Sequence, residues 1–226
     1  MSTPFVITID GYVATGKGTT AVGVAKELGF RYLDTWAMYR AVTLYIKRKG
    51  MLEASDAEKA ELMDEVVLSF SHNLTTGHDD MLLNGENIEA EIRSTNLALD
   101  LHYIVPVQPV RERLVDLQRA FIHTGNIIID GRDAGTVIFP QAQLKVFLIW
   151  DRAIRIQRRY DQLVRKWLNA DLEAVALEID RRDHTDYLWP EAVNKPADDA
   201  CFLDTSHTTI PEQIATVVTR ARERMV

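Results

Sequence analysis

A glycine-rich segment near the start of the chain has the residue types and spacing of a phosphate-binding loop. Residues 10–20 read DGYVATGKGTT, so Gly11 and Gly16 are separated by four residues and Lys17 follows directly. Glycines allow the backbone to turn its N–H groups toward phosphate oxygens, and a lysine here can bridge the β- and γ-phosphates of a nucleotide. The segment therefore predicts that the chain binds a nucleotide through its phosphates.

One position departs from the usual pattern of such loops. Ser or Thr normally follows the lysine and holds Mg²⁺, but Gly18 stands there and the hydroxyl comes one residue later, at Thr19. We therefore expect Mg²⁺ to be held mainly through water and a carboxylate from another part of the chain. Asp10 and Asp130, which both end apolar runs, are the candidates.

Further charged and polar residues follow extended segments. The stretch YLDTWAMYRAV places Thr35 where a strand gives way to a helix, with Arg40 about one turn further along. The stretch NIIIDGRDAGTVIFP ends its apolar run at Asp130 and continues with Arg132 and Asp133. Taken singly, each of these is more often a solvated charge or a helix cap. At the carboxyl ends of parallel strands, they predict one cleft with anion-binding groups beside the phosphate loop.

Strand-like runs alternate with helical patterns along the chain, which predicts an α/β fold with a parallel sheet. The runs NIIID and LKVFLI are continuously apolar, as in strands that helices cover on both faces. Helices are expected from about Lys17 to Leu28 and from Trp36 to about Arg48. The segment from about 64 to 103 breaks this rhythm, because VVLSFSHNL and DMLLNGENI resemble short strands, and it predicts a small insertion that contains β-structure.

Composition excludes several classes of protein. The chain has 226 residues, 46% of them apolar, which suffices for one substantial core. Its net charge of -7 argues against a nucleic-acid partner, and local positive charge is concentrated in the segment 151–166. No apolar run approaches the ~18 residues of a membrane span, and no secretory signal is present, so we expect a cytoplasmic protein without a membrane partner. Its single cysteine, Cys201, predicts no intramolecular disulfide.

The sequence resembles the cytidylate (CMP) kinase family of nucleoside monophosphate kinases, and the similarity runs nearly end to end. The segments that carry it are ITIDGYVATGKGTT, LDTWAMYRAV, LLNGENIEAEIRS, VRERLVDLQRAF, DGRDAGTVIFP, RRYDQL, RRDHTD and KPADDACFLDT. The resemblance implies a three-layer P-loop fold with a parallel five-stranded sheet. It also implies one kinase domain, with a core of residues 1–63 and 105–226, an NMP-binding insertion at about 64–104 and a mobile lid at about 155–190. The implied reaction is ATP-dependent conversion of CMP or dCMP to CDP or dCDP.

The resemblance also implies roles for individual residues. Those expected to bind ATP are Gly11, Ala14, Thr15, Gly16, Lys17, Gly18 and Thr19. Those expected at the acceptor are Thr35, Trp36, Arg40, His102, Arg111, Arg132, Asp133 and Asp186. Those expected to be catalytic are Lys17, Arg132, Arg155, Arg159 and Arg182, of which Arg155, Arg159 and Arg182 look like lid arginines that converge on the transferring phosphoryl group.

Three residues depart from the family pattern, and all three are expected near the acceptor. Trp36 stands where glycine is usual, His102 where a small hydroxyl residue is usual, and Trp189 where arginine is expected. Two alternatives to a CMP kinase therefore stay open. One is a kinase of the same fold that acts on a different or modified nucleotide or another small acceptor, and the other is an inactive nucleotide-binding module. In each case we expect a monomer that binds small nucleotides.

Overall fold

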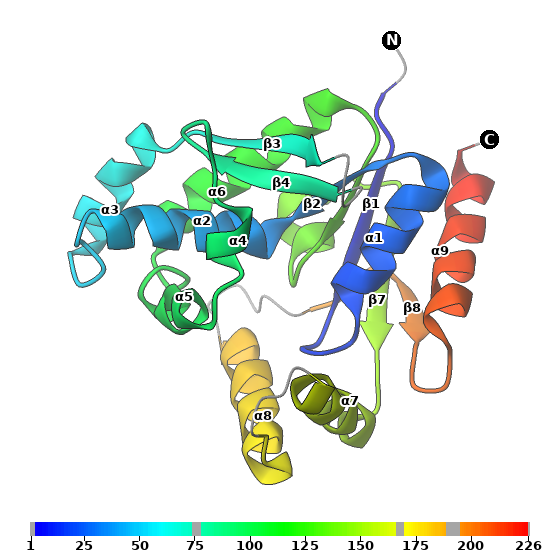
Figure 1. Cartoon of the computed structure of the whole chain (residues 1–226). Coiled ribbons are helices and arrows are strands. Elements are labelled where there is room, and N and C mark those ends of the chain that lie inside the picture. The colour runs from blue at the N-terminus through cyan, green and yellow to red at the C-terminus, as the bar shows by residue number, and fades with distance from the viewer. Residues whose placement is uncertain (1–2, 74–77, 166–169, 189–194, 226) are drawn as a thin grey trace. The chain divides into compact units, whose positions relative to one another are not determined.

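The structure is a computed structural model, and it describes residues 3–73, 78–165, 170–188 and 195–225 (Figure 1). The chain forms two compact units: unit 1 comprises Met1–Leu33 and Ile122–Val226, and unit 2 comprises Asp34–Phe121. Within the described ranges, no helix has both the length and the apolar character needed to cross a membrane.

A five-stranded sheet with the order β2-β6-β1-β7-β8 forms the centre of unit 1. Its strands are β1 (Val6–Gly11), β2 (Arg31–Asp34), β6 (Ile127–Asp130), β7 (Leu144–Ile149) and β8 (Cys201–Asp204). β1 pairs in parallel with both β6 and β7, with Val6 opposite Ile127 and Ile7 opposite Leu144. Every residue of β1 and β6 is buried, which explains why both strands are largely apolar. The predicted parallel five-stranded sheet is confirmed.

Helices flank this sheet. Unit 1 contains α1 (Lys17–Leu28), α7 (Arg152–Arg165), α8 (Leu172–Leu188), α9 (Ile210–Arg224) and the π-helical turn η4 (Ala134–Ile138), and η3 (Phe121–Thr124) leads into it from unit 2. α1 and α9 lie side by side (Figure 1) and pack with β1 around Ile7 and Ile9. A Cβ on Gly23 of α1 would lie 2.2 Å from Ile214 Cδ1 of α9, so a larger residue here would require the Ile214 side chain to move.

The two faces of β1 have different neighbours, because successive side chains of a strand point in opposite directions. Ile7 and Ile9 belong to the apolar core with α1 and α9. Asp10 points the other way and contacts η4, whose first two backbone N–H groups bind its carboxylate. The strand therefore supports a core on one face and a polar turn on the other.

Unit 2 combines helices with a second, antiparallel sheet of order β3-β4-β5. Its strands are β3 (Leu68–Asn73), β4 (His78–Leu83) and β5 (Glu86–Asn87). Its helical elements are α2 (Thr35–Arg48), α3 (Asp56–Leu62), η1 (Met63–Glu65), α4 (Glu89–Ile92), α5 (Thr95–Asp100), η2 (Leu101–Tyr103) and α6 (Gln108–Ala120). The β-structure predicted between 64 and 104 is present, whereas the boundaries given for the insertion and for a lid stay predictions.

Candidate active site

The glycine-rich loop has a backbone that only particular residues can adopt. Gly11 ends β1 with φ 147°, and a Cβ there would lie 2.4 Å from the carbonyl oxygen of Leu148 on β7. Gly16 is left-handed with φ 85° and ends the loop immediately before α1, while Ala14 is also left-handed with φ 61°. The loop thus turns tightly between strand and helix, and its last residues precede a helix N-terminus, where backbone N–H groups attract anions.

Lys17 lies inside this loop. Its side chain is buried, and Nζ donates hydrogen bonds to the carbonyl oxygens of Gly11 at 2.9 Å and of Tyr12 at 2.8 Å. Thr15 is also buried, and its hydroxyl donates to the carbonyl of Tyr12. Neutral carbonyl groups fix an ammonium group without cancelling its charge, so these contacts hold the lysine where it can attract a phosphate.

Asp10 supports the turn that follows β6. It is 6% exposed, and its two carboxylate oxygens accept hydrogen bonds from the backbone N–H groups of Ala134, at 2.9 Å, and Gly135, at 2.7 Å. Burial raises the pKa of Asp10 from 3.8 to about 6, although both backbone hydrogen bonds act in the opposite direction. The same turn carries Arg132, which is buried, and Asp133. Asp10 therefore fixes the segment on which two predicted site residues lie.

Asp130 lies beside the phosphate loop. One of its oxygens, Oδ1, accepts a hydrogen bond of 2.7 Å from the hydroxyl of Tyr32. A Cβ placed on Gly18 would lie 3.7 Å from the other oxygen, Oδ2. Within the described ranges, no group of three or more His, Cys, Asp or Glu side chains could hold a metal ion.

The predicted lid arginines have different neighbours. Arg155 on α7 is buried; its Nη1 donates to the carbonyl of Val13 at 3.1 Å, and its Nη2 lies 2.7 Å from Asp183 Oδ2 on α8. Its guanidinium also lies 5.3 Å from the ring centre of Tyr12, a cation–π distance. Arg155 thus contacts the phosphate loop directly, and Asp183 accepts from the backbone N–H of Val13 as well, at 3.4 Å.

Two other predicted lid residues, Arg159 and Arg182, lie near the carboxylate of Glu178. Arg159 Nη2 and Arg182 Nη1 lie 3.9 and 3.5 Å from the same oxygen of Glu178. Asp186 lies further along α8. Trp189, the third departure from the family pattern, falls outside the residues that the structure describes.

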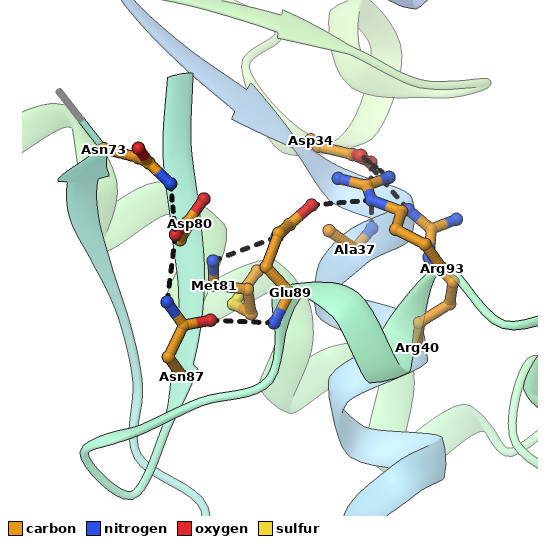
Figure 2. A network of polar contacts seen from close by, with 9 residues as sticks. All are labelled: Asp34, Ala37, Arg40, Asn73, Asp80, Met81, Asn87, Glu89 and Arg93. Atoms are coloured by element: carbon orange, nitrogen blue, oxygen red, sulfur yellow. Dashed lines mark hydrogen bonds and ion pairs between the residues drawn. The ribbon is translucent and has the colours of Figure 1, made fainter. Parts of the chain in front are cut away.

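In unit 2, Asp34 organises the start of α2, as Figure 2 shows. Its Oδ1 accepts from the backbone N–H of Ala37 at 2.8 Å and so caps the helix. Its Oδ2 accepts from Arg40 Nη2 at 3.1 Å and from Arg93 Nη1 at 2.8 Å. Thr35, the first residue of the helix, is buried. The helix cap and the predicted phosphate-binding arginine therefore depend on the same carboxylate.

The remaining predicted acceptor residues of unit 2 belong to three elements. The Trp36 ring packs against that of Tyr39, one turn along α2, with 5.7 Å between ring centres and a tilt of 40° between the ring planes. His102 is exposed in η2; its Nδ1 lies 2.5 Å from the carbonyl oxygen of Leu99, and its ring lies 4.0 Å from that of Tyr103. Arg111 is buried in α6.

The predicted residues therefore fall into two sets. Unit 1 brings together the loop, Asp10, Asp130 and Arg155, and unit 2 brings Arg40 to the start of α2. The sequence did not identify Asp34, Arg93 or Asp183 as site residues. The spacing of Glu89 and Arg93, which form an i,i+4 ion pair, could have revealed one local contact, but the ion pair of Arg93 with Asp34 spans 59 residues.

Known proteins are similar to this chain over nearly its whole length. A family model described as cytidylate kinase matches residues 7–223. The chain is similar to a cytidylate kinase of Parabacteroides distasonis, with 41% identity over 213 residues that cover 93% of both chains. It is also similar to one of Porphyromonas gingivalis, with 38% identity over 99% of this chain and 98% of that one.

Solved structures resemble the fold at low sequence identity. An uncharacterised protein of Eubacterium ventriosum matches with a TM-score of 0.55 and 12% identity, over 97% of this chain and 99% of that one. A protein of Thermus thermophilus matches with a TM-score of 0.52 and 13% identity, over the full length of both. At such identities the likeness supports the fold alone.

Proposed function

The chain belongs to the cytidylate kinase family, and from this premise we propose that it transfers the γ-phosphoryl group of ATP to CMP or dCMP. The products are ADP and CDP or dCDP. The observation that carries the proposal is the phosphate loop with Lys17 held inside it, in a chain that matches the family over residues 7–223.

The reaction needs alignment and charge neutralisation more than proton transfer. An oxygen of the acceptor phosphate attacks the γ-phosphorus, and the bond from that phosphorus to the oxygen bridging to the β-phosphate breaks, which leaves ADP. Because the attacking oxygen is already anionic near neutral pH, no general base is required. The protein aligns the two nucleotides and neutralises charge that spreads over the transferring group.

Cationic residues of unit 1 suit this task. In our proposal, the loop residues 11–19 hold the ATP phosphates, and Lys17 bridges the β- and γ-phosphates. Arg132, Arg155, Arg159 and Arg182 contact the transferring group, because a planar guanidinium makes two parallel hydrogen bonds to phosphate oxygens. Closure of a lid that contains the last three would exclude water from the phosphoryl group.

The acceptor is assigned to the second set of residues together with the turn after β6. We propose that Arg40 and Arg111 bind its phosphate, that Thr35 and Asp133 face the cytosine and its nucleotide, and that Asp186 faces the ribose. Trp36 and His102 complete the acceptor set.

Magnesium is expected to accompany ATP, and the residues present fit it. Asp130 lies close to the loop, 3.7 Å from a Cβ placed on Gly18, and its carboxylate and the hydroxyl of Thr19 offer the hard oxygen donors that Mg²⁺ prefers. We therefore propose Asp130 as the carboxylate that would hold the ion, partly through water, with Asp10 as the alternative. Bound there, Mg²⁺ would neutralise charge on the phosphates.

A second candidate function is phosphorylation of a different or modified nucleotide. The Trp36–Tyr39 aromatic pair at the start of α2 favours it, because an aromatic ring can offer a stacking face worth ~1–3 kcal/mol per base. An inactive nucleotide-binding module is the remaining alternative.

One assay separates these functions. ADP release is measured with magnesium-ATP and each of CMP, dCMP, UMP, dTMP, AMP and GMP. Strong turnover with CMP and dCMP alone supports the proposal, and turnover with another monophosphate supports the second candidate. No turnover with any of them, combined with ATP binding, identifies an inactive module.

We also propose that the protein is a cytoplasmic monomer without a nucleic-acid partner. Its net charge of -7 supports the last point. Sedimentation equilibrium tests the monomer, and a gel-shift experiment with DNA and RNA tests the absence of a nucleic-acid partner.

A further inference from the structure

Four charged residues of unit 2 form one network in which two carboxylates meet two guanidinium groups (Figure 2). They are Asp34, Arg40, Glu89 and Arg93. Three of the side chains are largely shielded from solvent, with exposures of 17% for Asp34, 16% for Arg40 and 25% for Glu89. Shielding from solvent strengthens the interactions among these charges.

Asp34 is held by three donors from two directions. The N–H of Ala37 binds one oxygen, and Arg40 and Arg93 bind the other. The carboxylate therefore cannot turn toward Arg40 without loss of its contact with Arg93. A single oxygen that serves two guanidinium groups divides its charge between them.

The guanidinium of Arg93 also binds a second carboxylate, that of Glu89. Its Nε donates to Glu89 Oε1 at 2.7 Å, while Glu89 Oε2 accepts from the backbone N–H of Met81 at 3.0 Å. Met81 lies on β4 and is fully buried. The position of the Arg93 guanidinium is thus set by the small sheet.

The same sheet also orients the backbone of Glu89. Its N–H donates to Asn87 Oδ1 at 3.0 Å, and Asn87 Nδ2 in turn donates to Asp80 Oδ2 at 2.9 Å. Asn73 of β3 donates to that oxygen as well, also at 2.9 Å. A continuous series of hydrogen bonds consequently runs from β3 to Arg40 on α2 (Figure 2).

We propose that Arg93 is a positioning residue for Arg40 and acts through Asp34; this inference rests on the proposed function of Arg40 at the acceptor phosphate. Without Arg93, Asp34 would offer its whole charge to Arg40, and an acceptor phosphate would have to compete with that carboxylate. With Arg93 in place, Asp34 holds the orientation of Arg40 but neutralises less of its charge. Arg93 therefore lowers the concentration of acceptor needed and has little effect on ATP.

The test compares Arg93→Ala, Arg93→Lys and a matched control, Arg48→Ala. Arg48 is also in unit 2 and also pairs with two carboxylates, those of Glu86 and Glu91, but it does not contact Asp34. We expect Arg93→Ala to raise the KM for CMP about tenfold, as for loss of a charge-assisted hydrogen bond, with the KM for ATP and kcat within about twofold. Arg93→Lys, which keeps the charge, should raise the KM for CMP less. Arg48→Ala should leave all three constants within about twofold.

A double-mutant cycle separates action through Arg40 from a direct contact of Arg93 with the acceptor. In an Arg40→Ala background, Arg93→Ala should change the KM for CMP by less than about twofold. If the rise in the KM for CMP in the double variant equals the product of the rises in the two single variants, the proposal is overturned. An unchanged KM for CMP in Arg93→Ala, or an equal rise in the KM for CMP and for ATP, would overturn it as well.

A spectroscopic measurement keeps the inference distinct from the proposed function. The side-chain Nε–Hε resonance of Arg40, assigned by its loss in Arg40→Lys, should shift in Arg93→Lys and stay in place in Arg48→Ala. An unmoved resonance in Arg93→Lys overturns the inference even where the enzyme phosphorylates CMP. If the wild-type protein does not phosphorylate CMP, the proposed function fails, and this resonance still reports whether Arg93 positions Arg40.

Discussion

The cations of the phosphate loop and those at the start of α2 are held in different ways. In unit 1, Lys17 donates to two main-chain carbonyl groups of the loop. In unit 2, Arg40 and Arg93 donate to the carboxylate of Asp34. Carbonyl groups orient a cation and leave its charge available, whereas a carboxylate orients it and neutralises part of it. The first arrangement suits a triphosphate with several charges, and the second suits an acceptor that carries one phosphate.

Arg155 combines both arrangements, because it binds the carbonyl of Val13 and the carboxylate of Asp183. Together with the ring of Tyr12, these contacts enclose its guanidinium. If Arg155 contacts the transferring phosphoryl group, as we propose, a phosphate must replace some of these partners. The comparison thus predicts that Arg155 contributes to stability as well as to catalysis, whereas Arg40 contributes mainly to binding.

The largest effect is expected for Lys17→Ala. Removal of the charge inside the loop should lower kcat by about 10³-fold, the cost of losing a group that stabilises developing charge. ADP release at saturating ATP and acceptor measures it, and circular dichroism confirms that the fold is retained. Near-normal turnover would show that the charge of Lys17 does not contribute to phosphoryl transfer.

Arg155→Ala should lower the free energy of unfolding by about 3 kcal/mol, because it removes the buried guanidinium that forms the ion pair with Asp183. Urea denaturation measures this value. Arg155→Ala combined with Asp183→Ala should recover part of the loss. If the double variant is no more stable than the single one, the ion pair does not account for the effect.

The burial of Asp10 in unit 1 can be tested by the pH dependence of protein stability. Because its pKa is raised from 3.8 to about 6, the folded state favours the protonated form; the resulting stabilisation is complete below pH 4 and is lost as the pH rises through 6. The difference between these pKa values corresponds to about 3 kcal/mol. Between pH 4 and pH 7, the stability of Asp10→Asn relative to the wild-type protein should therefore rise by up to that amount. Urea denaturation at several pH values measures it, and parallel curves would contradict it.

The smallest effect is expected for the stability of Arg40→Ala. Its loss should cost about 1 kcal/mol or less, because Asp34 keeps its ion pair with Arg93 and its cap on α2. Urea denaturation beside Arg155→Ala makes the comparison direct. A cost for Arg40→Ala as large as that for Arg155→Ala would remove the distinction between the two regions.

Local spacing explains which parts of the site could be predicted. Lys17 and Thr15 bind carbonyl groups of the loop that are no more than six positions away, and the sequence therefore revealed the loop. Its contacts with Arg155 and Asp183 join distant parts of the chain and were not revealed. β6 and β7 were recognisable as apolar runs because that pattern is also local. Their order was not, because β1 pairs with strands that follow more than a hundred residues later.

The contacts that hold the site residues in place could not be predicted, because they join residues that lie far apart in the sequence. Asp10 was expected as a candidate metal ligand, but its hydrogen bonds to Ala134 and Gly135 cross 124 and 125 residues. The ion pair of Asp34 with Arg93 spans 59 residues and is likewise non-local. A single sequence shows that such residues are charged, and only the folded chain shows which of them meet.

The pairing of β1 also has a consequence for the order in which the newly made protein folds. β1 ends at Gly11, but its partners begin at Ile127 and Leu144, so the strand leaves the ribosome long before it has a neighbour. Unit 2 is one continuous segment, Asp34–Phe121, and all of it is synthesised before β6. Because domains fold as they emerge, the unit that carries Arg40 can form while the strand that leads into the phosphate loop is still unpaired. Nascent chains of increasing length should therefore gain protease resistance in unit 2 first.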